Sequence, residues 1–292
     1  MKKVKNIIIS HSSLGDYHSC PRLWAWNRLG GLVPVEVPDE TSGPAFMGTL
    51  VHEAIDMAWT GGDWRARVAE LVPPGSALLE KPGDKAGSLD HTIELIERYL
   101  DFYDVPNEYD YELISSEQVL SIQLTDRITF SGRVDKIFKR KSDGKIVVVD
   151  HKTSKALSSW VIPLIPSNDQ FTAYIAAAQA NGIETSDFLV DGISTAKKYL
   201  KSPYECFIRV STTRSQADID EWKTHVIHDA NRLIHEIEHG SFSTGGRKNC
   251  LSFGGCAFLD VCNSPASQRL TILNNSYKRL DSPWALSKVT YK

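Results

Sequence analysis

Apolar residues recur along the chain in blocks with helical or strand-like spacing, and the order of these blocks predicts an α/β fold. In the first third, Ser13 and Asp16 have the spacing of a helix-capping pair, and Gly30-Gly31 ends a helix that carries Cys20. The stretch over 61–90 is rich in Pro and Gly, which predicts a mobile surface lid. The elements expected around these features are an opening strand, the helix with Cys20, a helix over about 45–59 and a helix over 91–105.

The centre of the chain changes to runs rich in β-branched residues. Three such runs predict a strand meander, in which Ser142-Asp143-Gly144 forms the tight turn between the last two. An alanine-rich helix ended by Asn181-Gly182 follows, and after a long amphipathic helix the chain ends in a polar tail with no strong pattern. The predicted elements are strands over 111–124, 126–140 and 145–154, a helix over 169–182, strands within 186–195 and 204–211, and a helix over about 215–238.

Composition restricts the class of protein. The 292 residues allow one large domain, 1–292, which we favour, or two small domains. A content of 41% hydrophobic and 24% charged residues is typical of soluble globular proteins. Neither a membrane-spanning run nor the apolar region of a secretory signal occurs, so we expect a cytoplasmic protein with no membrane partner. The formal net charge of −3 argues against binding nucleic acid by bulk charge, so any DNA contact must be local. Five cysteines in such a protein do not predict disulfides.

Candidate chemistry lies in the meander. Asp150 and Lys152 are two residues apart on a strand and project from one face, while His151 points the other way. Antiparallel pairing could bring Asp135 close to Asp150, and two converging carboxylates need a cation such as Mg²⁺ or Mn²⁺ between them. Such a metal would activate a water molecule, and Lys152 would offset charge on a phosphate being cleaved. The alternative is that Asp150 ends a strand and Lys152 is simply solvated.

Two helices carry further candidates. His52 would complete a mixed nitrogen and oxygen site if its helix packs against the sheet, although a lone histidine on a helix is more often structural. Gln170 and Tyr174 lie one helical turn apart and could hydrogen-bond a phosphate or sugar, but a packed tyrosine beside a capping glutamine is the alternative. Glu117 could add a carboxylate, although the sequence does not fix its direction.

The order of these motifs resembles the RecB-like branch of the PD-(D/E)xK nuclease superfamily over nearly the whole chain. GTLVHEAID resembles the first motif of that branch, SGRVDKIF the G-x-x-D strand, VVVDHKTS the (D/E)-x-K motif and DQFTAYIAAA the Q-x-x-x-Y helix. The resemblance implies a restriction-endonuclease-like catalytic core at about 45–240, with a central mixed sheet flanked by helices. The implied roles are metal ligation by His52, Asp135, Asp150 and the backbone carbonyl of His151, catalysis by Lys152 together with Asp135 and Asp150, and substrate contact by Gln170 and Tyr174. His151 departs from the tyrosine or apolar residue usual at this middle position.

The remaining cysteines suggest a second metal centre. Cys250, Cys256 and Cys262 lie close together in sequence, and Cys20 can complete the four ligands that zinc or a cubane cluster needs. SSLGDYHSCPRLWAW resembles the first helix of the iron–sulfur subgroup of RecB-like nucleases, which includes AddB and the CRISPR-associated adaptation nucleases. That resemblance implies a 4Fe–4S cluster that joins residues 12–30 to residues 246–266 as an iron–sulfur clasp. The first cysteine gap is longer than is usual in the family, so zinc stays an alternative.

Joining Cys20 to cysteines about 230 residues away in sequence would remove substantial entropy from the unfolded chain. On the scale known for disulfides this corresponds to roughly 5 kcal/mol. The fifth cysteine, Cys206, lies in an apolar strand pattern and is expected to be inert core.

These features together predict a metal-dependent DNA exonuclease that acts on single strands or DNA ends in recombination, repair, phage replication or CRISPR adaptation. No phosphate-binding G-x-x-x-x-G-K-[ST] loop occurs, so ATP-driven unwinding would require a helicase or recombination partner protein. The alternative function is a catalytically silent DNA-end-binding or scaffolding protein with the same fold. The sequence does not predict cleavage polarity, strand preference or oligomeric state.

Overall fold

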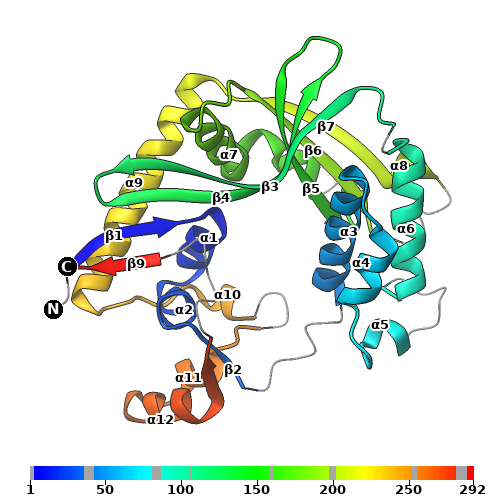
Figure 1. The fold of residues 1–292 in the computed structure, drawn as a ribbon. Coiled ribbons are helices and arrows are strands. Elements are labelled where there is room, and N and C mark those ends of the chain that lie inside the picture. Colours follow the sequence, from blue (N-terminus) through cyan, green and yellow to red (C-terminus); the bar gives the residue numbers. More distant parts are fainter. Residues whose placement is uncertain are drawn as a thin grey trace. The chain divides into compact units, whose positions relative to one another are not determined.

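The computed structural model divides the chain into two compact units (Figure 1). The central unit comprises residues 39–119 and 133–215, and the terminal unit comprises residues 1–38, 120–132 and 216–292. Strands β3 and β4 contribute residues to both. The structure describes residues 3–35, 43–80, 87–105, 107–157, 161–196, 202–251, 255–280 and 288–292.

The central unit is built on a mixed sheet. β4 pairs with β3 and, antiparallel, with β5, β5 runs parallel to β6, and β6 pairs antiparallel with β7. The predicted meander and its tight turn are confirmed, because β4 and β5 form a hairpin with Gly144 at φ 72°. The strands are β3 (Tyr111–Thr125), β4 (Ile128–Arg140), β5 (Ile146–Ser154), β6 (Asp187–Ser194) and β7 (Phe207–Thr213).

Helices cover both faces of this sheet, as predicted for an α/β fold. On one face Val147 and Val149 of β5 join a core formed with α3, α4 and α6, which lie side by side in Figure 1. On the other face Phe171 of α7 stacks on Phe188 of β6, with ring centroids 4.3 Å apart. The helices are α3 (Gly43–Trp59), α4 (Trp64–Leu71), α5 (Ala77–Glu80), α6 (Leu89–Phe102), a 3₁₀ helix (Ile162–Ser167), α7 (Asp169–Ala180) and α8 (Pro203–Cys206).

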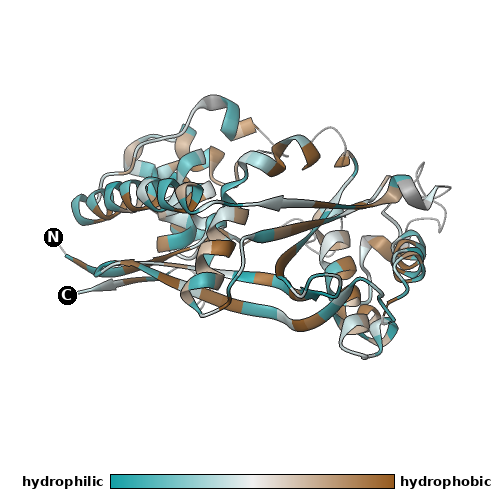
Figure 2. Cartoon of the chain, turned by 90° about the horizontal axis from the view of Figure 1, so that it is seen from above, coloured by the Kyte–Doolittle hydropathy of each residue, from teal (hydrophilic) through white to brown (hydrophobic). Residues whose placement is uncertain are grey.

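The terminal unit combines segments that are far apart in sequence. β1 (Val4–Ile9) pairs in parallel with the first residues of β4 and antiparallel with β9 (Lys288–Tyr291). Hydrophilic turns of α9 (Gln216–His239) alternate with hydrophobic residues in Figure 2, and its buried Trp222 contacts Phe130 edge-on. The other elements are α1 (His11–Ser19), α2 (Pro21–Trp24), a π-helix (Ala25–Leu29), β2 (Leu32–Pro34), α10 (Arg247–Leu251), α11 (Leu259–Asn263), α12 (Ala266–Ser276) and β8 (Tyr277–Arg279).

The start of the first helix differs from the prediction. Ser10, which is extended at φ −126°, caps α1 by accepting a hydrogen bond from the backbone N–H of Ser13. Ser13 therefore lies inside the helix, where its buried hydroxyl accepts a hydrogen bond from Trp24 Nε1. Cys20 is not within α1 either, since it caps the short helix α2 that follows.

Part of the stretch 61–90, which the sequence predicted to be a surface excursion or lid, is regular structure packed on the core. Asp63 caps α4 by accepting hydrogen bonds from the backbone N–H groups of Arg65 and Ala66, and Trp64 and Val68, one helical turn apart, are buried in the core. Residues 81–86 lie outside the described part of the chain. The Pro and Gly content thus indicated the connecting segments, but it did not indicate the short amphipathic helix α4 that lies between them.

The polar tail also forms regular structure. β8 pairs with β2, and β9 pairs with β1, in each case across more than 240 residues of sequence. Such long-range partners leave no local periodicity. In the described part of the chain no helix is long and apolar enough to cross a membrane. A single domain over 1–292 stays a prediction.

Candidate functional site

Three of the predicted residues meet where β4 and β5 run side by side. Lys136 pairs with Val149, and the next residues along this antiparallel register are Asp135 and Asp150. Asp150 and Lys152 both reach Gln170 of α7, as expected for residues two apart on a strand. The hairpin therefore brings the two carboxylates and the lysine together within the central unit.

Asp150 is surrounded by hydrogen-bonding groups. Its Oδ2 lies 2.6 Å from Lys152 Nζ, and its Oδ1 accepts a hydrogen bond of 3.4 Å from Gln170 Nε2. Gln170 also accepts a bond from Lys152 Nζ at 3.0 Å and donates one to the hydroxyl of Tyr174 at 3.0 Å. Burial raises the pKa of Asp150 to about 6, although the charge of Lys152 opposes that rise. The Q-x-x-x-Y helix thus contacts the acid and lysine directly.

Asp135 is approached by two histidines. Its Oδ2 accepts a 2.7 Å hydrogen bond from the backbone N–H of His151 and lies 3.5 Å from the Nδ1 atoms of both His52 and His151. Burial would raise the pKa of Asp135, but hydrogen bonding and charge from His151 outweigh it and lower that pKa. Burial lowers the pKa of His52 to about 4, so its imidazole is neutral near pH 7 and its nitrogen can bind a metal.

Close packing of α3 on β5 puts His52 in this position. Gly48, one turn before His52, lies so near β5 that a Cβ atom there would be 2.9 Å from Thr153 Oγ1. The helix buries Leu50 and Val51 completely in the core beside it. The condition that the sequence left open, that this helix packs against the sheet, is met.

Glu117 reaches the same site through an irregularity in β3. Its φ of 50° lies in the left-handed region, which is rare for a residue other than glycine. The alternation of exposed and covered residues along β3 shifts by one position just before it, as at a β-bulge. Burial and the nearby charge of Asp135 raise the pKa of Glu117, and Arg133 lies 3.3 Å from its carboxylate. No glycine or other local signal in the sequence indicates this bulge.

A buried ion pair adjoins the site and was not predicted. The side chain of Lys136, which follows Asp135, is only 1% exposed, and its ammonium lies 3.3 Å from Asp56, one helical turn after His52. This pair connects the strand of Asp135 to the helix of His52. A lysine in a strand gives no sign in sequence that it is buried.

The donor types in the site suit a divalent cation, although the geometry is not that of a loaded site. Within the described ranges no group of three or more His, Cys, Asp and Glu side chains is arranged to hold a metal ion. Asp150 instead contacts Lys152 and Gln170, while Asp135 contacts the two histidines. Carboxylate oxygens with one neutral imidazole are ligands that Mg²⁺ and Mn²⁺ accept.

Four cysteines line one cavity of about 830 Å³ in the terminal unit. Cys20 Sγ accepts hydrogen bonds from the backbone N–H groups of Leu23 at 3.5 Å and Gly245 at 3.2 Å. Burial raises the pKa of Cys256, and nearby charge on the other three thiols raises it further. The structure thus gathers Cys20 with the three C-terminal cysteines. The fifth, Cys206, belongs to α8 rather than to a strand and is fully buried. Cys250 and Cys262 are the other two cysteines that line the cavity.

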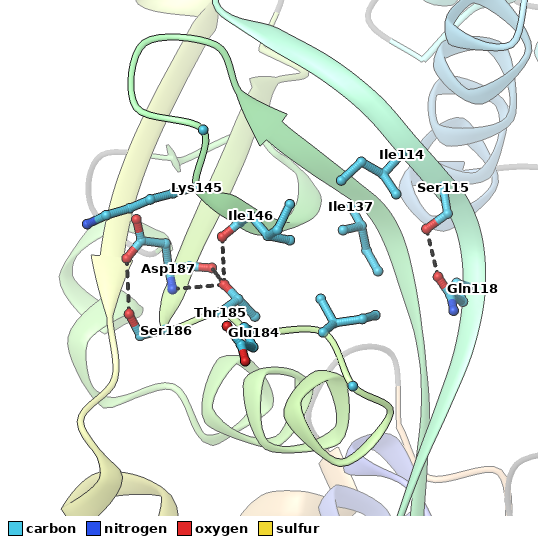
Figure 3. A pocket seen from close by; sticks show the side chains of 13 residues that line it. Ile114, Ser115, Gln118, Ile137, Lys145, Ile146, Glu184, Thr185, Ser186 and Asp187 are labelled. Atoms are coloured by element: carbon cyan, nitrogen blue, oxygen red, sulfur yellow. Dashed lines mark hydrogen bonds between the residues drawn. The ribbon is translucent and has the colours of Figure 1, made fainter.

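A second cavity, of about 880 Å³, lies at the opposite end of β5 from Asp150 (Figure 3). Its wall combines isoleucines of β3, β4 and β5 with the polar loop that follows α7. Figure 3 shows Thr185 hydrogen-bonded to the backbone of Ile146 and Asp187 beside Ser186. None of the predicted site residues lines this cavity.

Comparison with known protein families decides the broad class. The family model of the PD-(D/E)XK nuclease superfamily matches residues 8–263. The chain belongs to this superfamily. The match includes strands β3 to β7, the residues Asp135, Asp150 and Lys152, and both cysteine segments. The α/β fold and nuclease class predicted from the motifs are confirmed at that level.

One solved structure has a similar fold. A crystal structure from Eubacterium rectale named "Putative exonuclease" is similar with a TM-score of 0.51 and 14% identity, covering 90% of this chain and 92% of that chain. The crystal structure of SSO0001 shares 15% identity over 78% of this chain and 89% of that chain, with a TM-score of 0.34, which is too low to compare folds. No curated protein sequence matches this chain significantly.

Proposed function

We propose that this PD-(D/E)XK protein is a Mg²⁺- or Mn²⁺-dependent deoxyribonuclease, and specifically an exonuclease that acts on single-stranded DNA or DNA ends. One observation carries the proposal: Asp135, Asp150 and Lys152 converge at the β4–β5 hairpin, with His52 3.5 Å from Asp135. The E. rectale neighbour and the family resemblance favour exonuclease over endonuclease action. Recombination, repair, phage replication and CRISPR adaptation are the processes such an enzyme would serve.

The residues have complementary roles in this proposal. His52, Asp135, Asp150 and the backbone carbonyl of His151 would hold the metal, which supplies charge to lower the pKa of a bound water and to polarise the phosphate. Lys152 orients the attacking water and stabilises negative charge on the phosphate oxygens. Water oxygen bonds to phosphorus, the bond to one deoxyribose oxygen breaks, and that oxygen takes up a proton.

Gln170 and Tyr174 are placed to support the lysine and the substrate. Gln170 Oε1 accepts a hydrogen bond from Lys152 Nζ, which restricts where the ammonium can lie. The hydroxyl of Tyr174 accepts a bond from the same amide and keeps its own proton to donate to a phosphate or sugar oxygen. Burial raises the pKa of Tyr174, which keeps this hydroxyl protonated during the reaction.

The cysteine cavity is proposed to hold a 4Fe–4S cluster. Four thiols around one cavity are the ligand set of such a cluster, and backbone N–H groups directed at Cys20 stabilise a thiolate. Zinc, with the same four ligands, is the alternative. Brown anaerobic protein containing about four iron and four sulfide per chain supports the cluster; colourless protein that contains zinc overturns it.

A nuclease assay tests the catalytic proposal. Protein purified anaerobically is incubated with end-labelled single- and double-stranded DNA and Mn²⁺, Mg²⁺ or EDTA, and Lys152→Ala is compared with Lys145→Ala. Lys145 is exposed at the other end of β5, so its removal controls for loss of a surface charge. Metal-dependent release of short products by the wild type and Lys145→Ala, but not by Lys152→Ala, is expected. Cleavage in EDTA, or equal cleavage by Lys152→Ala, overturns the assignment.

The second candidate is a catalytically silent protein that binds or scaffolds DNA ends. The intact carboxylates and lysine disfavour it, and binding of DNA without cleavage in any metal would support it. A helicase or recombination protein is the proposed partner, because the sequence has no phosphate-binding G-x-x-x-x-G-K-[ST] loop with which to drive unwinding itself. Action in the cytoplasm is part of the same proposal.

A further inference from the structure

Behind β5, on the face opposite Lys152, the central unit buries a chain of polar side chains. His151 is 2% exposed, and Tyr99 of α6 and Asp191 of β6 are fully buried. Arg209 of β7 and Glu108, in the segment before β3, continue the chain toward the outer strand. These groups lie beside a core that is otherwise formed mainly by aliphatic and aromatic side chains.

The contacts run without a break from the proposed metal site. His151 Nδ1 lies 3.5 Å from Asp135 Oδ2, and on the other side of the ring Nε2 lies 3.5 Å from the Tyr99 hydroxyl and 3.8 Å from Asp191 Oδ2. Tyr99 donates a 2.5 Å hydrogen bond to the same Asp191 oxygen, and Arg209 Nε donates one of 3.2 Å to it.

Stability does not explain this arrangement. A whole buried ion pair such as Asp191 and Arg209 could be replaced by apolar residues at little or no cost, because the attraction within a buried ion pair seldom exceeds the loss of hydration. Arg209 forms ion pairs with both Asp191 and Glu108, so its single positive charge is shared between two carboxylates. What the network does fix is the orientation of the His151 ring, which is held at both nitrogens.

We propose that the side chain of His151 is a positioning residue, which fixes the carboxylate of Asp135 for metal binding and is itself oriented by Asp191 and Tyr99. The proposal rests on the proposed function and deepens it. The backbone N–H of His151 already holds Asp135 Oδ2, and the imidazole adds a second restraint on the same oxygen. Groups that orient a metal ligand in this way typically change metal affinity by 10- to 100-fold when they are removed.

Binding of Mn²⁺ to the full-length protein, measured by isothermal titration calorimetry, tests the role without an activity assay. His151→Phe keeps a ring of similar size but removes both nitrogens, and its Kd for Mn²⁺ is expected to rise roughly 10- to 100-fold. His151→Asn places an amide near the position of Nδ1 and is expected to recover much of that loss. Tyr99→Phe removes one hydroxyl from the far side of the ring and is expected to raise Kd by a smaller factor.

Asp187→Asn is the matched control. Asp187 lies on the same strand as Asp191, is also buried and pairs with Arg140, but it lies at the opposite end of β6. It should lower the melting temperature without changing the Kd for Mn²⁺.

The outcomes separate the two proposals. If the wild type binds no Mn²⁺, the proposed function fails. If the wild type binds Mn²⁺ and His151→Phe binds it within twofold, the positioning role is overturned while the proposed function stands. Should His151→Phe not fold, Tyr99→Phe decides, and an unchanged Kd in that variant overturns the role.

Discussion

Gly245 offers the sharpest test of the cysteine cavity. A Cβ atom at this position would lie 2.0 Å from the carbonyl oxygen of Ser19 and 3.0 Å from Cβ of Cys20. The first contact is with backbone, so Gly245→Ala must move either the loop of Gly245 or the junction that carries Cys20. Either movement lengthens the 3.2 Å hydrogen bond from the Gly245 N–H to Cys20 Sγ.

The size of the effect follows from two contributions. Overpacking a close contact costs about 1–3 kcal/mol, and the lost hydrogen bond adds about 1 kcal/mol. The expected loss in the free energy of unfolding is therefore about 2–4 kcal/mol, which corresponds to a fall of roughly 3–7 °C in Tm for a protein of 292 residues. Because Cys20 itself is displaced, metal or cluster content should fall as well.

Gly246→Ala is the control for this variant. It has the same chemistry one residue along, where an added Cβ meets nothing within 4 Å. Both proteins are purified anaerobically, and iron, sulfide and zinc per chain are measured beside a thermal melt. Gly245→Ala should melt lower and hold less metal than Gly246→Ala. Equal metal content and melting temperatures within a degree would refute the close packing of the two segments.

Three further predictions concern the central unit. Because burial raises the pKa of Asp150 to about 6, protonation of its carboxylate competes with metal binding below that pH. The Kd for Mn²⁺ should therefore be constant above pH 7 and rise about tenfold per pH unit below pH 6. A Kd that is independent of pH down to pH 5 would contradict this. Gly48→Ala should push α3 from Thr153 and lower the rate of DNA cleavage about tenfold, with recovery in Gly48→Ala/Thr153→Ala; a lack of recovery would show that the contact is not the cause. Glu117→Gln removes a carboxylate that Asp135 repels, so the metal-free protein should melt at a higher temperature while the Kd for Mn²⁺ rises. A lower Tm with an unchanged Kd would indicate a simple loss of packing and would exclude a role at the metal site.

Local patterns predicted the parts of the fold whose interactions are close in sequence. The β4–β5 hairpin is fixed by its turn and by alternation, so the shared face of Asp150 and Lys152 and the opposite direction of His151 followed from the sequence. The approach of Gln170 to Asp150 needed α7 to return over the sheet after β5, which the order of strand and helix already indicated. The nuclease superfamily followed from the order of the motifs.

The parts that could not be predicted depend on distant partners or on backbone geometry. Glu117 has a left-handed φ although it is not a glycine, so the sequence does not indicate this conformation. The burial of Lys136 depends on Asp56, which is 80 residues away in sequence. The role of Asp191 is equally hidden, because an aspartate in a hydrophobic strand gives no sign of the histidine and arginine that satisfy it. Composition alone made 61–90 look like a lid, although Trp64 and Val68 anchor it.

The scattered origin of the terminal unit has a consequence for how the protein is made. The central unit draws on residues 39–119 and 133–215, all of which are synthesised before α9. β1 can pair with β4 early, but its other edge gains a partner only once β9 has been made. Cys20 must likewise wait for Cys250, Cys256 and Cys262. The nuclease core is therefore expected to take shape first, whereas the cysteine cavity can be completed only after Cys262 has been synthesised, which sets the earliest moment at which a metal centre can be inserted.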